Sequence, residues 1–113
     1  MVIVNEDGSV CISRGDTGEI VIDFEEDIPM DGTKCVFTVK KYLTSKHTLI
    51  EKTEDILDGS VTFKLTADDT KDLQFGEYWW DIRLFYETDA VVSPFCHPMT
   101  FRVTRVSGND LLL

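Results

Sequence analysis

Alternation of apolar and polar residues with a period of two constrains this chain most, because it places successive side chains on opposite faces of a β-strand. The clearest run covers residues 61–66, where Val61, Phe63 and Leu65 alternate with polar residues. Such a run predicts a strand with one face on a core and the other face in water.

Similar runs recur along the whole chain and predict seven or eight strands. They lie at residues 10–12, 20–24, 35–40, 48–52, 61–65, 78–87, 91–95 and 100–104. Asp-Gly or Phe-Gly pairs fall between several of them, where a turn needs a positive φ or a side chain that bonds its own backbone. Many short strands separated by regular turns are typical of an all-β protein, here an antiparallel β-sandwich of immunoglobulin-like size.

One segment, residues 66–73, departs from the alternation and predicts a single helical turn. Thr66 and Asp69 are three residues apart, which is the spacing of a reciprocal helix cap. Asp68 and Asp69 also suit this end, because the helix dipole is positive there. We expect the turn to cross one end of the sandwich.

The length of 113 residues limits the chain to one domain. We expect a single sandwich over residues 1–106 and a C-terminal tail over residues 107–113. No run approaches the ~20 apolar residues that span a bilayer. The first residues lack the basic leader of a secretory signal, so we expect the chain to be made and kept in the cytosol.

The formal net charge of −10 and the isoelectric point near 4.4 bear on the partners of the chain. Phosphate groups bind clustered lysine and arginine, so neither a nucleic acid nor an anionic membrane is an expected partner.

Few residues suit catalysis or metal binding. Cys11, Cys35 and Cys96 each lie in an apolar alternating run, and we expect them to be reduced core residues. His47 lies in a polar segment and is expected to be exposed. Cys96 and His97 are adjacent, but neighbours on a strand point to opposite faces. Because the ligand types are scattered, we predict no enzyme activity, no catalytic residues, no metal site and no cofactor.

The aromatic run at residues 78–80 is the most informative feature for function. It begins a strand whose alternate residues, from Tyr78 to Leu84, are expected to fill the core. The opposite face then carries four candidate interface residues: Trp79, Asp81, Arg83 and Phe85. Three explanations stay open: a covering loop, a platform on which a sugar stacks, or burial against another subunit. Without a covering loop, the interface is favoured over a sugar site, because no set of Asn, Gln and Asp stands out around these residues.

The order of these segments resembles the immunoglobulin-like domain of phage and prophage structural proteins, in particular the N-terminal domain of the phage baseplate upper protein. The resemblance covers roughly residues 9–106. The segments that carry it are Ile12–Thr17, Cys35–Lys41, Leu49–Thr53, Gly59–Thr70 and Gly76–Arg83. Between residues 88 and 98 the chain departs from these relatives, because it has two prolines and lacks their glycine hairpin.

The resemblance implies a noncatalytic module of a baseplate, tail or fibre that acts through protein contacts. It implies other phage structural proteins, or copies of the chain in a homo-oligomer, as partners. It also implies that the protein resides in the virion after synthesis in the cytoplasm of a bacterial host. The alternative reading is a carbohydrate-binding β-sandwich that uses Trp79 or neighbouring aromatic residues.

Overall fold

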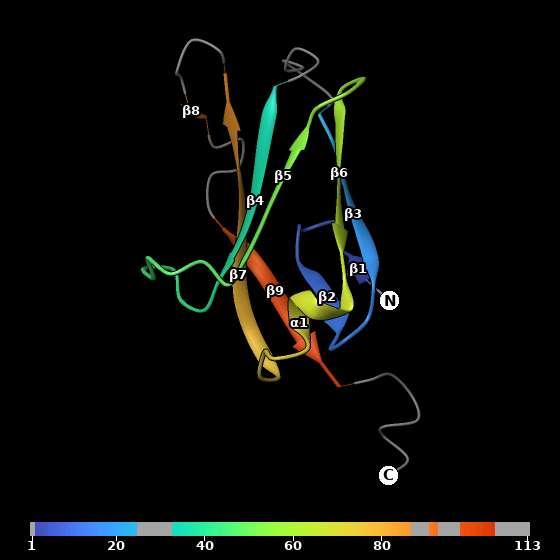
Figure 1. The fold of residues 1–113 in the computed structure, drawn as a ribbon, viewed down its shortest axis with the longest axis vertical. Helices are drawn as coiled ribbons and strands as arrows, with labels where there is room; N and C mark the ends of the chain where they lie inside the picture. Colours follow the sequence, from blue (N-terminus) through green and yellow to red (C-terminus); the bar gives the residue numbers. More distant parts are fainter. Residues whose placement is uncertain (1, 25–32, 87–90, 93–97, 106–113) are drawn as a thin grey trace.

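The computed structural model describes residues 2–24, 33–86, 91–92 and 98–105. In that part of the chain, two β-sheets face each other and one helical turn lies at an end of the sandwich (Figure 1). The elements are β1 (Val2–Val4), β2 (Val10–Ser13), β3 (Gly18–Asp23), β4 (Lys34–Lys40), β5 (Ile50–Asp55), β6 (Ser60–Leu65), α1 (Ala67–Thr70), β7 (Gly76–Phe85), β8 (Val91–Val92) and β9 (Met99–Thr104). Among the described residues, no helix is long and apolar enough to cross a membrane.

The larger sheet has the strand order β1-β2-β9-β7-β4-β5, with β8 beside β7, and the smaller sheet pairs β3 with β6. The all-β sandwich expected from the alternation is therefore confirmed. The expectation of purely antiparallel pairing is wrong at one place, because β2 runs parallel to β9. These two strands come from opposite ends of the domain, so no hairpin forces them to run in opposite directions.

Most strand boundaries lie within two residues of the expected ones, and three segments need comment. β1 was not expected, and it adds a short strand antiparallel to β2. The run at residues 48–52 corresponds to β5, which begins and ends later, at Ile50 and Asp55. The run at residues 91–95 contains β8, while residues 93–97 and the tail at residues 107–113 lie outside the described part of the chain.

The predicted turn at Asp58 and Gly59 leads from β5 into β6. Both residues have positive φ, at 52° and 75°. Two successive positive φ values are typical of a tight type I′ turn, and the bridge between Leu57 and Ser60 closes it. The Asp-Gly pair therefore marks the point at which the chain passes between the two sheets.

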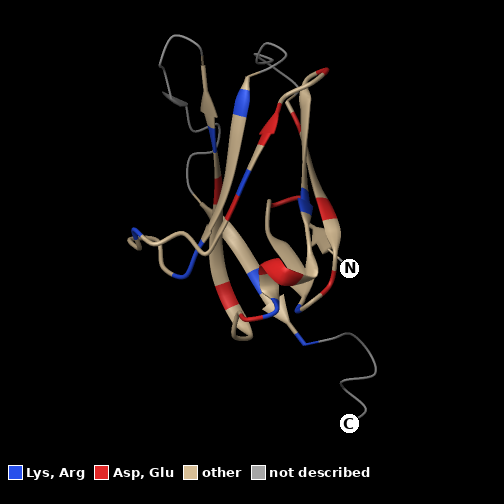
Figure 2. Ribbon diagram, in the orientation of Figure 1, with Lys and Arg blue, Asp and Glu red and all other residues tan. Residues whose placement is uncertain are grey.

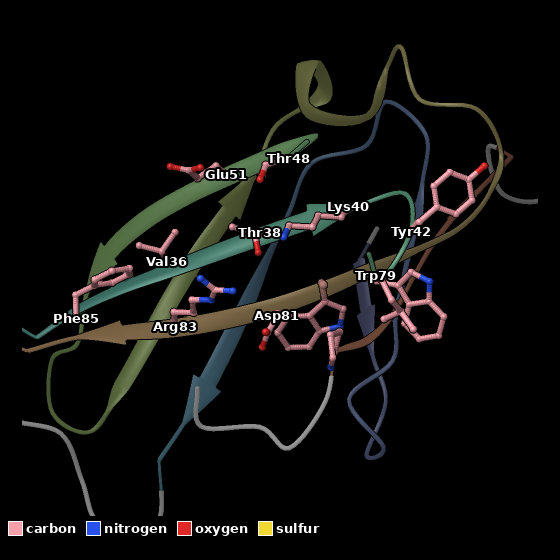
Figure 3. Close-up of a pocket in the computed structure, with 13 residues that line it drawn as sticks. Val36, Thr38, Lys40, Tyr42, Thr48, Glu51, Trp79, Asp81, Arg83 and Phe85 are labelled. Carbon is pink, nitrogen blue, oxygen red and sulfur yellow. The ribbon is translucent and has the colours of Figure 1, made fainter. Parts of the chain in front are cut away.

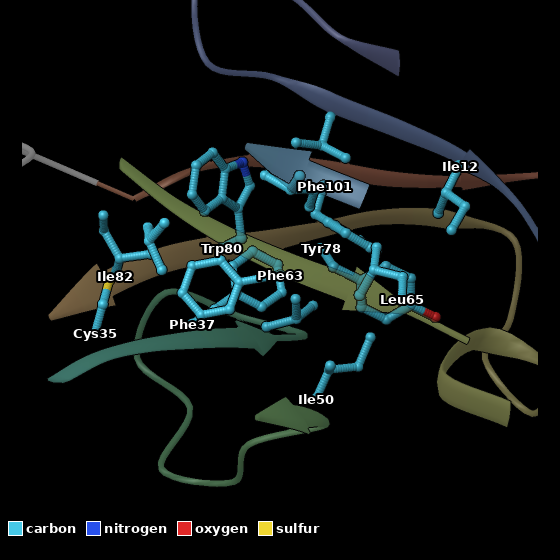
Figure 4. Close-up of a cluster of buried hydrophobic side chains, with 14 of the residues drawn as sticks. Ile12, Cys35, Phe37, Ile50, Phe63, Leu65, Tyr78, Trp80, Ile82 and Phe101 are labelled. Atoms are coloured by element: carbon cyan, nitrogen blue, oxygen red, sulfur yellow. The ribbon is translucent and has the colours of Figure 1, made fainter. Parts of the chain in front are cut away.

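Phe37 on β4 lies at the centre of an aromatic cluster that joins the two sheets (Figure 4). Its ring centroid is 5.3 Å from that of Phe63 on β6 and 5.5 Å from that of Trp80 on β7. The ring of Phe101 on β9 lies 6.3 Å away, nearly edge-on. Since Phe63 belongs to the smaller sheet and the others to the larger one, these contacts hold the sandwich closed.

The buried indole of Trp80 also fixes the turn between β1 and β2. Its Nε1–H donates a hydrogen bond of 2.9 Å to the carbonyl oxygen of Gly8, which satisfies the one polar group of the side chain. Gly8 has φ of 89°, and a Cβ there would lie 2.2 Å from the sulfur of Met99. Glycine is therefore favoured at this turn for its positive φ, and a larger residue would also displace the Met99 side chain.

The helical turn α1 begins with the capping pair that the spacing predicts. The backbone N–H of Thr66 donates to the Asp69 carboxylate at 2.7 Å, and the Thr66 hydroxyl donates to the same oxygen at 3.2 Å. The same carboxylate forms an ion pair of 3.0 Å with Lys52 on β5. Asp69 therefore ties α1 to the edge of the larger sheet.

We expect Phe37→Ala to lower the free energy of unfolding by about 3–5 kcal/mol, because it opens a cavity between the sheets. Phe85→Ala removes a ring of the same type that is 40% exposed, and it should cost about 1 kcal/mol or less. Chemical denaturation of both variants measures the difference. Equal losses in the two variants would contradict this account of the core.

We also expect Asp69 to make the free energy of unfolding depend on pH. Burial acts to raise the pKa of this carboxyl, but the hydrogen bonds from Thr66 and the charge of Lys52 outweigh it and hold the pKa below its ordinary value of 3.8. A lowered pKa in the folded state stabilises the protein above the pKa of the unfolded chain, and this contribution is lost as the pH falls through the lower folded value.

The measurement compares wild type with Asp69→Asn in denaturant titrations over a range of pH. The difference in unfolding free energy should be about 1 kcal/mol at neutral pH. It should shrink once the pH falls below about 4. A difference that stays constant down to acid pH would show that the charge of Asp69 is not the cause.

Candidate functional site

A groove of about 360 Å³ runs along the outer face of β4, β5 and β7 (Figure 3). We call this surface the outer groove. It exists because alternate residues of these strands point away from the core. It is lined by Val36, Thr38, Lys40, Tyr42, Leu43, Thr48, Glu51, Trp79, Trp80, Asp81, Arg83, Phe85 and Pro98.

All four candidate interface residues from the aromatic strand line the outer groove. They are the outward residues of β7, from Trp79 to Phe85. The assignment of the two faces is confirmed, since the alternate residues Tyr78, Trp80, Ile82 and Leu84 are at most 3% exposed. Figure 3 shows Trp79 and Phe85 at opposite ends of the groove, with Asp81 and Arg83 between them.

The register between β7 and β4 supplies a second row of lining residues that the sequence reasoning missed. Arg83 lies opposite Val36, Asp81 opposite Thr38, and Trp79 opposite Lys40. The alternation in residues 35–40 already put Val36, Thr38 and Lys40 on one face. What it could not show is that β4 is the neighbour of β7, because strand pairing is a long-range property.

Glu51 extends the same surface onto β5, where it lies opposite Thr38. Beyond the strands, the connection at residues 41–49 brings Tyr42 to the end of the groove that holds Trp79, and Leu43 of the same connection also lines the groove. These two side chains are 65% and 56% exposed. This loop therefore flanks the groove. Among the described residues, Phe85 stays exposed and Trp79 is only half-buried.

The charged side chains of the outer groove form no ion pairs within the described part of the chain. Lys40, Glu51 and Arg83 form no ion pair there. Asp81 accepts a hydrogen bond of 2.8 Å from the backbone N–H of Ile82, its own neighbour. The four side chains therefore remain available to a binding partner.

The formal charges of the side chains that line the outer groove sum to zero, although the chain as a whole is strongly acidic. Its lining contains two cationic and two anionic side chains, whereas the chain as a whole carries −10. Figure 2 shows basic and acidic residues interspersed along β4, β5 and β7. Another acidic protein would meet less repulsion here than at a purely acidic surface.

The cysteines divide into two environments. Cys35 on β4 is fully buried, and burial raises the pKa of its thiol to about 12, as expected for an unreactive core residue. Cys11 is only half-buried, so its assignment to the core is wrong. It alternates with the inward residues Val10 and Ile12 on β2, and it therefore lies on the outer face of the sheet.

The remaining candidates for chemistry do not come together. Cys96 and His97 lie outside the described residues. His47 is exposed in the loop between β4 and β5, where its backbone N–H donates to the Ser45 hydroxyl at 3.3 Å. The described ranges contain no group of three or more His, Cys, Asp or Glu side chains arranged to hold a metal ion.

Comparisons with known proteins identify structures with a similar fold. No protein-family model matches the chain, and no curated protein matches it. The immunoglobulin-like domain of mouse leukocyte-associated immunoglobulin-like receptor 1, solved as a strand-swapped dimer, is similar in structure. The TM-score is 0.51 at 12% identity, over 93% of this chain and 97% of that one.

A second structure, the extracellular domain of the same mouse receptor in a strand-swapped dimer, matches with a TM-score of 0.45 and 13% identity. That match covers 96% of this chain and 91% of the receptor chain. The first likeness, together with the two facing sheets, shows that this chain has an immunoglobulin-like β-sandwich fold.

Proposed function

We propose that this chain is a noncatalytic structural module of a phage or prophage particle, in a baseplate, tail or fibre. It docks onto other structural proteins, or onto copies of itself, through the outer groove. It resides in the virion after synthesis in the cytoplasm of a bacterial host. The resemblance over roughly residues 9–106 supports the phage setting.

One observation supports the docking role: on one sheet face, exposed aromatic residues lie beside charged side chains that form no ion pair with any described residue. Phe85 and Tyr42 expose 40% and 65% of their surface, and Trp79, at the same end of the groove as Tyr42, is half-buried. Exposed apolar area rimmed by polar groups marks a protein contact more often than an ordinary surface. Aromatic residues and arginine are also the side chains that contribute most binding energy at protein interfaces.

Association between copies fits the same surface. The mouse receptor domain with a similar fold is a strand-swapped dimer, so a sandwich of this class can assemble with its own copy. In this chain, the balanced charge of the outer groove limits the repulsion between two molecules that each carry −10.

The proposal predicts that Trp79→Ala with Phe85→Ala lowers the amount of this protein in purified phage particles by about tenfold or more. Losing central aromatic anchors costs roughly 2 kcal/mol or more of binding energy. The measurement is quantitative mass spectrometry of particles produced from a genome that carries the substituted gene.

Val21→Ala is the matched control, because Val21 is 51% exposed on β3 in the opposite sheet. It should leave incorporation unchanged. Circular dichroism of both variants checks that they fold. Particles that contain no wild-type protein would contradict the phage setting, and normal incorporation of the double variant would contradict the docking surface.

Carbohydrate binding is the second candidate function, and the position of two aromatic side chains in the outer groove supports it. Figure 3 shows Tyr42 and Trp79 at one end of the outer groove, and the carboxylates of Asp81 and Glu51 also line it. An aromatic face beside carboxylates can stack on a sugar ring and accept bonds from its hydroxyls. The groove volume of about 360 Å³ also falls within the range of small-ligand sites.

If a sugar is the ligand, wild type should bind on a glycan array and Trp79→Ala should reduce binding by about tenfold or more. Asp81→Asn should weaken it as well, because the amide lacks the charge of the carboxylate. Leu57→Ala, at an exposed position in the turn between β5 and β6, is the control. An array on which wild type binds nothing would exclude this candidate.

A further inference from the structure

Four consecutive outward residues of β7 form a pattern that is complementary to itself when it is reversed; the outward residue before them, Glu77, is ion-paired with Arg102 on β9. In chain order they are aromatic, acidic, basic and aromatic: Trp79, Asp81, Arg83 and Phe85. The midpoint of the pattern is the buried residue Ile82. If a second β7 runs antiparallel across the first at this point, each acid meets a base and each aromatic ring meets a ring.

We propose that the outer groove binds a second copy of this chain, face to face, about a twofold axis that passes over Ile82 and lies perpendicular to β7. This inference rests on the proposed function, in which the same surface docks. A twofold interface uses the same patch on both molecules, so the patch must be complementary to itself. In this dimer Asp81 of each copy faces Arg83 of the other, and Trp79 faces Phe85.

The charges of the central pair support this arrangement. Arg83 is exposed and forms no ion pair within the described residues. Asp81 accepts a hydrogen bond from the backbone N–H of Ile82 and forms no ion pair with the residues that the structure describes. Both groups lie between the two aromatic ends of the groove, so a second copy would cover them and exclude water. Opposite charges in that position strengthen association and fix the register of the two copies.

The neighbouring strand is compatible with the same axis. On β4, Lys40 lies opposite Trp79 and Lys34 lies opposite Phe85. The twofold therefore brings Lys40 toward Lys34 of the second copy. Lys34 is already ion-paired with Asp55 on β5, which reduces the repulsion between the two lysines. At the centre of β4, Thr38 meets Val36 of the second copy, and this contact involves no charge.

The test reverses each central charge by itself. In Asp81→Arg, two cations of one copy face two cations of the other, and in Arg83→Asp two anions face two anions. Sedimentation equilibrium should show a wild-type dimer. Each single variant should dimerise at least about tenfold more weakly, because like charges face each other twice.

Mixing the two single variants should restore dimers, since the cations of one variant then face the anions of the other. Native mass spectrometry distinguishes this mixed dimer by its mass. The combined variant Asp81→Arg with Arg83→Asp should dimerise by itself. Recovery in both experiments requires that positions 81 and 83 face each other across a twofold axis.

The matched control uses an exposed pair of opposite charges on the other sheet. Glu19 on β3 and Lys64 on β6 lie opposite each other in register, and both are exposed. Glu19→Lys and Lys64→Glu make changes of the same size in net charge, and they should leave the dimer constant within about threefold.

Several results would overturn the inference: wild type that remains monomeric at millimolar concentration, single variants that dimerise normally, or a mixture that does not recover. A dimer that survives both reversals forms elsewhere, for example by strand exchange. These outcomes are separate from the particle experiment. Monomeric wild type whose incorporation still requires Trp79 would refute the twofold dimer alone, whereas charge-dependent dimers that are absent from particles would refute the phage role alone.

Discussion

The contact of Phe37 with Phe63 across the two sheets is the interaction on which the rest of the structure depends. β3 and β6 form a sheet of only two strands, and a two-stranded sheet is marginal by itself in water. Its stability comes from packing on the larger sheet, where the rings of Trp80 and Phe101 surround Phe37. Within the larger sheet, β4 and β7 pair as antiparallel neighbours, and these two strands form the floor of the outer groove.

The alternation that fills the core also builds the groove. Each inward residue of β7, such as Trp80 or Ile82, leaves its neighbours pointing outward. On a strand facing water, those neighbours would ordinarily be short polar or charged residues. Here they include Trp79 and Phe85, which the core does not need and which the loop at residues 41–49 does not bury. The proposed docking role would account for these two outward aromatic side chains.

Charge decides what kind of binding this face favours. A chain with a net charge of −10 repels its own copies and other acidic proteins over most of its surface. The outer groove is an exception, because Lys40 and Arg83 balance Asp81 and Glu51. Its side chains can therefore give a contact both affinity, through the aromatic rings, and register, through the charges. These two properties connect the proposed structural role with the proposed twofold dimer.

The sequence by itself determined the fold class, the helical turn capped by Thr66 and Asp69, and the outward side of β7, because alternation and capping are local properties. It misplaced Cys11 and the start of β5, and it did not indicate β1 or the parallel pairing of β2 with β9. Only the tertiary structure decided that β4 and β5 lie beside β7, and so that Lys40, Glu51 and Tyr42 join Trp79 in one groove. The physical reason is that strand neighbours are chosen by packing between residues far apart in the chain, and the pattern within a single strand carries no record of that choice.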